Sequence, residues 1–170
     1  MKSLLVLTTA MAFFAGTAHA EFKMGYVDIQ KAIQTSKAGK KAKETLQGEA
    51  DKKNKELEKK KTDIEKMRED LEKKASVLTD DVRKKKEMEV QEEMMKWNQS
   101  AGKAQGDLQK REGELLAPIV EKMKKVIEKT AKDKGLSMVI QSSQNAQIVL
   151  YSSAEYDLTD VVIKAFDAEK

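Results

Sequence analysis

The chain of 170 residues contains no cysteine, and its single histidine, His19, lies close to the N-terminus. The sequence after His19 therefore excludes disulfides, thiolate or histidine zinc sites, and the Ser-His-Asp and Cys-His arrangements of hydrolases. The acidic pairs Glu92-Glu93 and Asp80-Asp81 lie in strongly charged helical sequence without catalytic context, and no glycine-rich phosphate loop occurs. We predict that the protein is not an enzyme and uses no cofactor.

The main apolar segment lies at the N-terminus rather than inside the chain. Lys2 precedes the apolar stretch Leu4–Phe14, and the small-residue sequence AHA follows at residues 18–20. This order is typical of a secretory signal peptide, and the stretch is shorter than the roughly 20 apolar residues of a membrane span. We expect cleavage between Ala20 and Glu21 and an exported protein. A buried N-terminal helix is the alternative.

Proline and glycine are scarce over almost a hundred residues, because only Pro118 and a few glycines interrupt the stretch from Lys37 to Lys134. The remaining residues are mostly Lys, Glu, Gln, Ala, Leu and Met, which lose little rotamer freedom in a helix. This length predicts a coiled coil or a helical hairpin. The chain is expected to reverse at Ser76–Asp81, where Thr79 suits a helix N-cap and two aspartates complement the helix dipole. A single uninterrupted helix is the alternative.

The apolar row along the first predicted helix is thin. Leu57, Ile64, Leu71 and Leu78 recur every seven residues, but the companion heptad positions are often Lys or Asn. Such a row supports one partner helix rather than a thick bundle core. A fuller apolar face follows from residue 115 onward and is typical of a helix that packs on a sheet.

Short β-branched and aromatic segments flank the helical stretch and predict three strands. These strands are residues 22–29, 136–141 and 147–151, accompanied by a short helix at 30–35 and a last helix at 160–167. A monomer would leave such a small sheet with open edges and too little core. The sequence therefore predicts an α+β, predominantly helical fold that oligomerises through its sheet-containing part.

The predicted elements divide the chain into a signal peptide, a body and an arm. The signal peptide is residues 1–20, the body is residues 21–36 and 115–170, and the arm is residues 37–114 with its tip near 76–81.

Charge is distributed unevenly between the arm and the body. Residues 37–75 hold 14 Lys and Arg against 10 Asp and Glu, whereas residues 135–170 hold two against five. Two interpretations of the basic runs near the tip stay open: solvated helix faces with acidic neighbours, or an arm that attracts an anionic partner. Nucleic acid is disfavoured by the export signal and by the lack of aromatic residues among the lysines.

Two segments at the ends of the mature chain carry a recognisable pattern. KMGYVDIQKAIQTSKAGKKA follows the predicted signal peptide. The C-terminal segment contains an apolar strand at Met138–Ile140, a strand ending in tyrosine at Ile148–Tyr151, and Asp157-Leu158-Thr159 before the last helix. Together they resemble the Skp/OmpH family of periplasmic chaperones, whereas the middle matches only in its coiled-coil composition.

The resemblance implies a periplasmic homotrimer whose small β-barrel body carries three helical-hairpin arms around a cavity. Family members hold unfolded outer-membrane proteins there without ATP. The resemblance also implies lipopolysaccharide or an anionic membrane surface as a further partner, without assigning residues. The competing hypothesis is an exported coiled-coil structural or adaptor protein of the cell envelope.

Within this framework we nominate two sets of residues. The methionines suit adaptable contacts, although a helical methionine row is more often core, and both interpretations stay open. The predicted client-contacting residues of the arm are Lys59, Lys60, Lys61, Met67, Arg83, Lys84, Lys85, Lys86, Met88 and Met95. The predicted trimer contacts of the body are Tyr26, Val27, Ile29, Met138, Ile140, Ile148, Leu150 and Tyr151.

Overall fold

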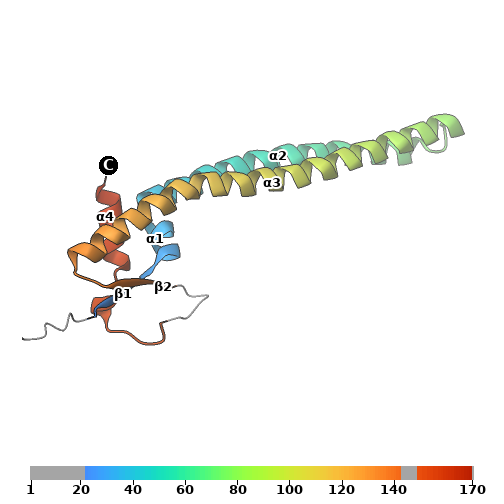
Figure 1. Ribbon diagram of the computed structural model, residues 1–170. Coiled ribbons are helices and arrows are strands. Elements are labelled where there is room, and N and C mark those ends of the chain that lie inside the picture. Colours follow the sequence, from blue (N-terminus) through green and yellow to red (C-terminus); the bar gives the residue numbers. More distant parts are fainter. Residues whose placement is uncertain (1–21, 143–148, 170) are drawn as a thin grey trace, which may run out of the picture.

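A long two-helix arm projects from a small body in the computed structural model, which describes residues 22–142 and 149–169 (Figure 1). The predominantly helical fold expected from the sequence is confirmed. The predicted signal peptide with its cleavage site at Ala20 and Glu21, and the nominated Ile148, lie outside the described residues. The elements in chain order are β1 (Met24–Asp28), α1 (Ile29–Thr35), α2 (Lys37–Lys74), α3 (Asp80–Asp133), β2 (Met138–Ser142), the 3-10 helix η1 (Ala154–Tyr156) and α4 (Thr159–Ala168).

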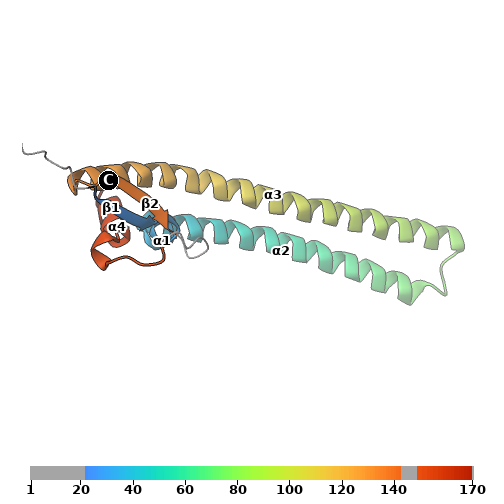
Figure 2. The same ribbon diagram turned by 60° about the horizontal axis from the view of Figure 1, so that its bottom comes forward.

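The arm is a hairpin of α2 and α3, as the sequence predicted, and Figure 2 shows the two helices running side by side to the tip. Ser36 caps α2 with its hydroxyl, which accepts a hydrogen bond from the Gly39 N–H. Thr79 occupies the N-cap position of α3 but makes no side-chain capping bond. α3 continues without a break past residue 114, so the division between arm and body there stays a prediction.

The sheet consists of β1 and β2, which pair in parallel from Met24 opposite Met138 to Asp28 opposite Ser142. Parallel strands need a long crossover, and here the whole arm supplies it. The third strand predicted at residues 147–151 is wrong for its described part, because residues 149–151 form no strand. The other side of β1 bridges to Asp157 at Tyr26, so that edge is already in use.

The core of the body gathers side chains from both ends of the chain. Val27 of β1, Met123 of α3 and Val162 of α4 are each at most 1% exposed. The same cluster contains Ala42 of α2 and Met123 of α3. The core of the body therefore holds both arm helices at the ends where they meet the body. The full cluster is Val27, Ala32, Ala42, Ile119, Met123, Val126, Leu158, Val162 and Phe166.

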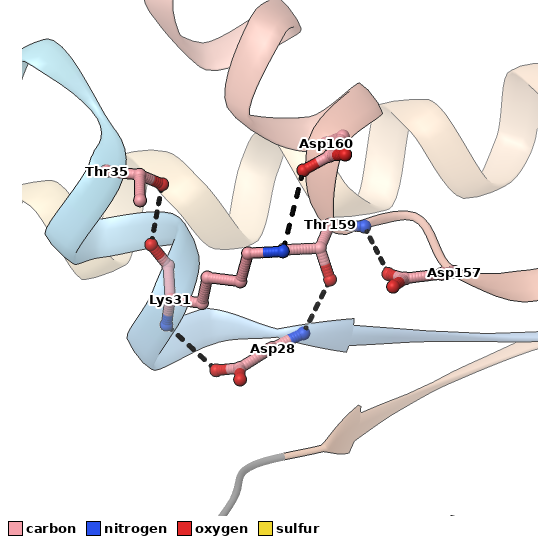
Figure 3. A network of polar contacts seen from close by, with 6 residues as sticks. All are labelled: Asp28, Lys31, Thr35, Asp157, Thr159 and Asp160. Atoms are coloured by element: carbon pink, nitrogen blue, oxygen red, sulfur yellow. Dashed lines mark hydrogen bonds and ion pairs between the residues drawn. The ribbon is translucent and has the colours of Figure 1, made fainter. Parts of the chain in front are cut away.

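A polar network fastens the C-terminal segment to the end of β1 (Figure 3). The Thr159 hydroxyl accepts a hydrogen bond from the Asp28 N–H at 3.0 Å, and the Asp157 carboxylate accepts one from the Thr159 N–H at 2.9 Å. Asp28 also caps α1 by accepting from the Lys31 N–H at 2.8 Å, and Lys31 pairs with Asp160 at 3.8 Å. The Asp-Leu-Thr tripeptide therefore joins β1 to the start of α4, and Asp160 extends the network to α1.

The first turn of α2 lies unusually close to α1. A Cβ atom placed on Gly39 would lie 1.7 Å from the carbonyl oxygen of Ile33, a backbone atom that cannot move aside alone. The Asp167 carboxylate of α4 accepts a hydrogen bond from the Lys37 N–H at 2.9 Å and fixes the same turn from another side. Only glycine fits this contact between the arm and the body.

Replacing Gly39 with alanine is predicted to lower the free energy of unfolding by about 2 kcal/mol, since the overpacking outweighs the gain in helix propensity. Gly48 is the matched control, because it lies in the same helix with nothing within 4 Å of an added Cβ. Gly48→Ala should raise the free energy of unfolding by up to about 1 kcal/mol. Urea denaturation followed by circular dichroism measures both, and equal effects of the two substitutions would contradict the packing argument.

Candidate functional site

The basic runs lie on the exposed surface of the arm, and only some of their charges are paired. Lys61 pairs with Glu65 at 3.9 Å, and Arg83 pairs with Asp80 at 3.1 Å. Within residues 22–142 and 149–169, the remaining lysines of the two runs form no ion pair within 4.0 Å. These unpaired lysines, which carry the positive charge available to a partner, are Lys59, Lys60, Lys84, Lys85 and Lys86.

The nominated methionines occupy two different environments. Met88 and Met95 lie one heptad apart on α3 and are 53% and 65% exposed, so they are not core residues. Met67 is half-buried between the helices and, with Lys86, borders a gap of about 100 Å³. Met88 and Met95 therefore offer flexible apolar contacts on a surface that is otherwise charged.

Three polar contacts cross the hairpin nearer to the body. The Trp97 indole N–H donates to the carbonyl oxygen of Leu57 at 2.9 Å. Lys53 pairs with Asp107 at 2.9 Å, and Arg111 pairs with Glu49 at 3.1 Å. These contacts fix the register of α2 against α3 along this part of the arm.

Sequence reasoning missed the role of Trp97 and placed it only near the middle of the return helix. The signal available was the chain's single tryptophan in an arm with few aromatic residues. A partly buried indole N–H usually has a hydrogen-bond acceptor, and the opposite helix was the nearest source of one.

The cross-hairpin ion pairs shift the pKa values of their members. The hydrogen bond from Lys53 lowers the pKa of Asp107, and the hydrogen bond to Glu49 raises the pKa of Arg111. Because the pKa of Asp107 is lower in the folded state, its pairing contributes stability above the ordinary carboxyl pKa. That contribution is lost as the pH falls through the lowered value.

The body presents an exposed, partly apolar hollow beside the sheet. It has a volume of about 660 Å³ and is lined by Phe22, Met24, Tyr26, Ile140, Tyr151 and Tyr156, among others. Three of the nominated trimer contacts, Tyr26, Ile140 and Tyr151, therefore lie together.

The other nominated body residues divide between the surface and the core. Leu150 is 88% exposed and Met138 is 48% exposed. Val27 is 1% exposed and belongs to the core of its own chain, and Ile29 packs against that core. Val27 and Ile29 thus support the sheet from within, whereas Met138 and Leu150 are exposed.

The described part of the chain has neither a membrane-spanning helix nor a metal cluster. None of its helices is both long enough and apolar enough to cross a membrane. Nor does it contain a group of three or more acidic or histidine side chains placed to hold a metal ion.

Comparisons with known proteins agree with this architecture. A family model described as outer membrane protein (OmpH-like) matches residues 23–166. A solved structure from Caulobacter crescentus CB15, described as an OmpH-like candidate outer membrane chaperone, is similar with a TM-score of 0.78. It is 19% identical, and the match covers 94% of this chain and 92% of that chain, which shows a common fold. A search of curated proteins found no match.

Trp97→Phe keeps an aromatic ring in the arm but removes the hydrogen bond to Leu57. The free energy of unfolding is expected to fall by about 1 kcal/mol, because the Leu57 carbonyl retains its helical partner. Gln99→Ala, an exposed change nearby on α3, should alter it by less than about 0.5 kcal/mol. Thermal unfolding followed by circular dichroism checks both variants, and equal stability of Trp97→Phe and the parent chain would refute the assigned role.

Lys53→Met is predicted to raise the pKa of Asp107 toward its ordinary value of 3.8, because it removes the hydrogen bond with the largest effect. Lys110→Met is the control, since Lys110 acts on Asp107 only through its charge and should produce a smaller rise. Carboxyl-carbon NMR titration measures both. A larger shift in Lys110→Met than in Lys53→Met would show that the cross-hairpin pair does not form.

Proposed function

Because the chain belongs to the OmpH-like family, we propose that it is an ATP-independent holdase chaperone of the periplasm. In this proposal it binds unfolded outer-membrane β-barrel proteins between its arms and prevents their aggregation. The predicted signal peptide supports export, and the lack of catalytic residue patterns supports a binding role. The observation that carries the proposal is the arm, a long hairpin whose outer surface is charged and exposed rather than packed.

The contacts proposed for the client are weak and numerous. Met88 and Met95 provide adaptable apolar side chains, and the unpaired lysines attract acidic segments of an unfolded chain. The apolar hollow on the arm lies at its base, where Ala42, Leu46 and Leu115 help to line about 660 Å³, far from the basic runs near the tip. The surface that carries the lysines and methionines suits many clients of similar chemistry better than a single specific ligand.

The assembly proposed for the protein is a homotrimer. β2 has one edge without a strand partner among the described residues, and the exposed hollow beside the sheet is rich in aromatic side chains. Open edges and exposed apolar surface are commonly covered by a neighbouring subunit. Three copies joined through their bodies would place three arms around a central cavity.

The test is to dilute a urea-unfolded outer-membrane β-barrel protein into buffer without ATP and to follow its aggregation by light scattering. The mature protein is expected to suppress aggregation at low salt, with weaker suppression at high salt because the ionic attraction is screened. Exchange of the five unpaired lysines for glutamine should raise the amount needed for half-suppression by at least about threefold, and exchange for arginine should not.

The possible results test the binding residues, the holdase activity and the trimer separately. Suppression that is indifferent to salt and to the glutamine changes would move the binding from the lysines to Met88 and Met95. No suppression at a several-fold excess of protein would reject the holdase and favour the structural or adaptor hypothesis. Light scattering of the protein alone tests the assembly, and a uniform monomer would reject the trimer.

A further inference from the structure

The arm consists of two halves that are held together differently. The hydrogen bond and ion pairs that cross the hairpin all lie between residues 49–57 and residues 97–111. We call this part the proximal arm, and we call residues 58–74 with 80–96 the distal arm. In the distal arm, every ion pair of the described residues joins side chains of the same helix.

The apolar contact between the helices of the distal arm is also incomplete. Ile64 and Val90 are its only buried side chains, at 4% and 7% exposed. Beside Val90 the two helices leave the gap of about 100 Å³, which Lys74 and Lys86 border together with Met67 and Leu71. This gap is open to solvent, so the apolar side chains along it lack partner atoms on one side. Residues 80–89 of α3, between the tip and Val90, are all exposed. The helices of the distal arm therefore adhere through few contacts between Val90 and the tip.

The turn at the tip adds little to hold the helices together. Val77 is 79% exposed, although it lies between the two helix ends. Thr79 makes no capping hydrogen bond from its side chain. The turn connects α2 and α3 without a cluster that would resist their separation.

We propose that the distal helices separate reversibly while the proximal arm stays joined, and that the surface exposed in this way binds client. This surface, which we call the inner seam, consists of Ile64, Met67, Leu71 and Val90. This inference rests on the proposed function. It adds to that function a second binding surface, which the closed arm conceals. Its occupant is an extended segment of an unfolded outer-membrane protein, which presents apolar side chains on one face.

The chemistry of the inner seam fits this occupant. Ile64 and Leu71 lie one heptad apart on α2 and form a short apolar row. The same gap is bordered by Lys74, which pairs with Asp70 at 3.6 Å, and by Glu89 and the unpaired Lys86. Lys86 can meet the acidic residues of the segment, and the other charged side chains can meet its polar face. The closed arm buries Ile64 but leaves Leu71 only half-buried, and the apolar side chains of the client replace the contact that these residues give up when the helices separate.

Cross-linking tests the opening, since the chain contains no cysteine of its own. Met67→Cys/Val90→Cys joins two residues that border the same gap and locks the distal arm. Leu57→Cys/Ser100→Cys joins two residues that border one groove of the proximal arm and is the matched control. A short bis-maleimide linker closes each pair, and each protein is compared with its own unlinked form in the aggregation assay.

The distal link is expected to reduce the amount of client held at least about twofold, whereas the proximal link should leave it unchanged. If the distal link has no effect, or if both links reduce binding equally, the inner seam is not a binding surface. In either case the unlinked protein still suppresses aggregation, so the proposed function stands. If the unlinked parent chain fails to suppress aggregation, the proposed function fails and the client-binding inference fails with it.

Hydrogen exchange of the unmodified full chain tests the separation without any client. Amides of residues 62–72 and 84–94 are expected to exchange at least about tenfold faster than those of residues 49–57 and 100–111. The distal link should slow the exchange of residues 62–72 and 84–94, which distinguishes separation of the helices from fraying within each helix. Equal rates in the two halves, or exchange unchanged by the link, would overturn the inference.

Discussion

The parallel pairing of β1 with β2 is the constraint on which the rest of the structure depends. It joins strands separated by about 110 residues, and closing a flexible loop of that length opposes folding through chain entropy. The arm reduces this entropic opposition, because a hairpin of two long helices brings its own ends back together. Conversely, the sheet and the core beneath it fix those ends, so the arm and the body each depend on the other.

The fold consequently contains a gradient of stability from the body to the tip. At the base, Met123 and Val162 are fully buried, and Asp167 and Gly39 hold the first turn of α2 against its neighbours. Along the proximal arm, the Trp97 hydrogen bond and two ion pairs replace apolar packing. Beyond Trp97 no hydrogen bond or ion pair of the described residues joins the two helices; Ile64 and Val90 are buried between them, and residues 80–89 nearer the tip are all exposed. Regions with few buried contacts open most readily, which places the most adaptable surface farthest from the body.

The sequence predicted the features that follow from repetition and local chemistry. The heptad row from Leu57 to Leu78 indicated two long helices, and Thr79 with its two following aspartates indicated where they reverse. It could not predict contacts that depend on how distant elements meet. In the sequence Gly39 resembles an ordinary helical glycine, and only the folded structure shows that the Ile33 carbonyl leaves no room for a Cβ atom there. Residues 149–151 have the composition of a strand but pair with neither edge of the sheet, because Asp157 occupies the free edge of β1 and these residues do not extend along β2.

The electrostatics of the arm favour capture that is reversible. Most ion pairs of the described arm join residues of one helix three or four positions apart, as Lys73 does with Glu69, and these pairs neutralise part of the arm's charge locally. Only the lysines without such neighbours extend a field outward, and salt screens that field within about 8 Å under physiological conditions. In the proposed function, an unfolded client is therefore attracted only when it is already close to an arm. Because each proposed contact is weak, the client would exchange one lysine or methionine for another without leaving, and its release would need no chemical energy. A holdase without a nucleotide-binding motif needs contacts that are numerous enough to bind a client and weak enough to release it for folding.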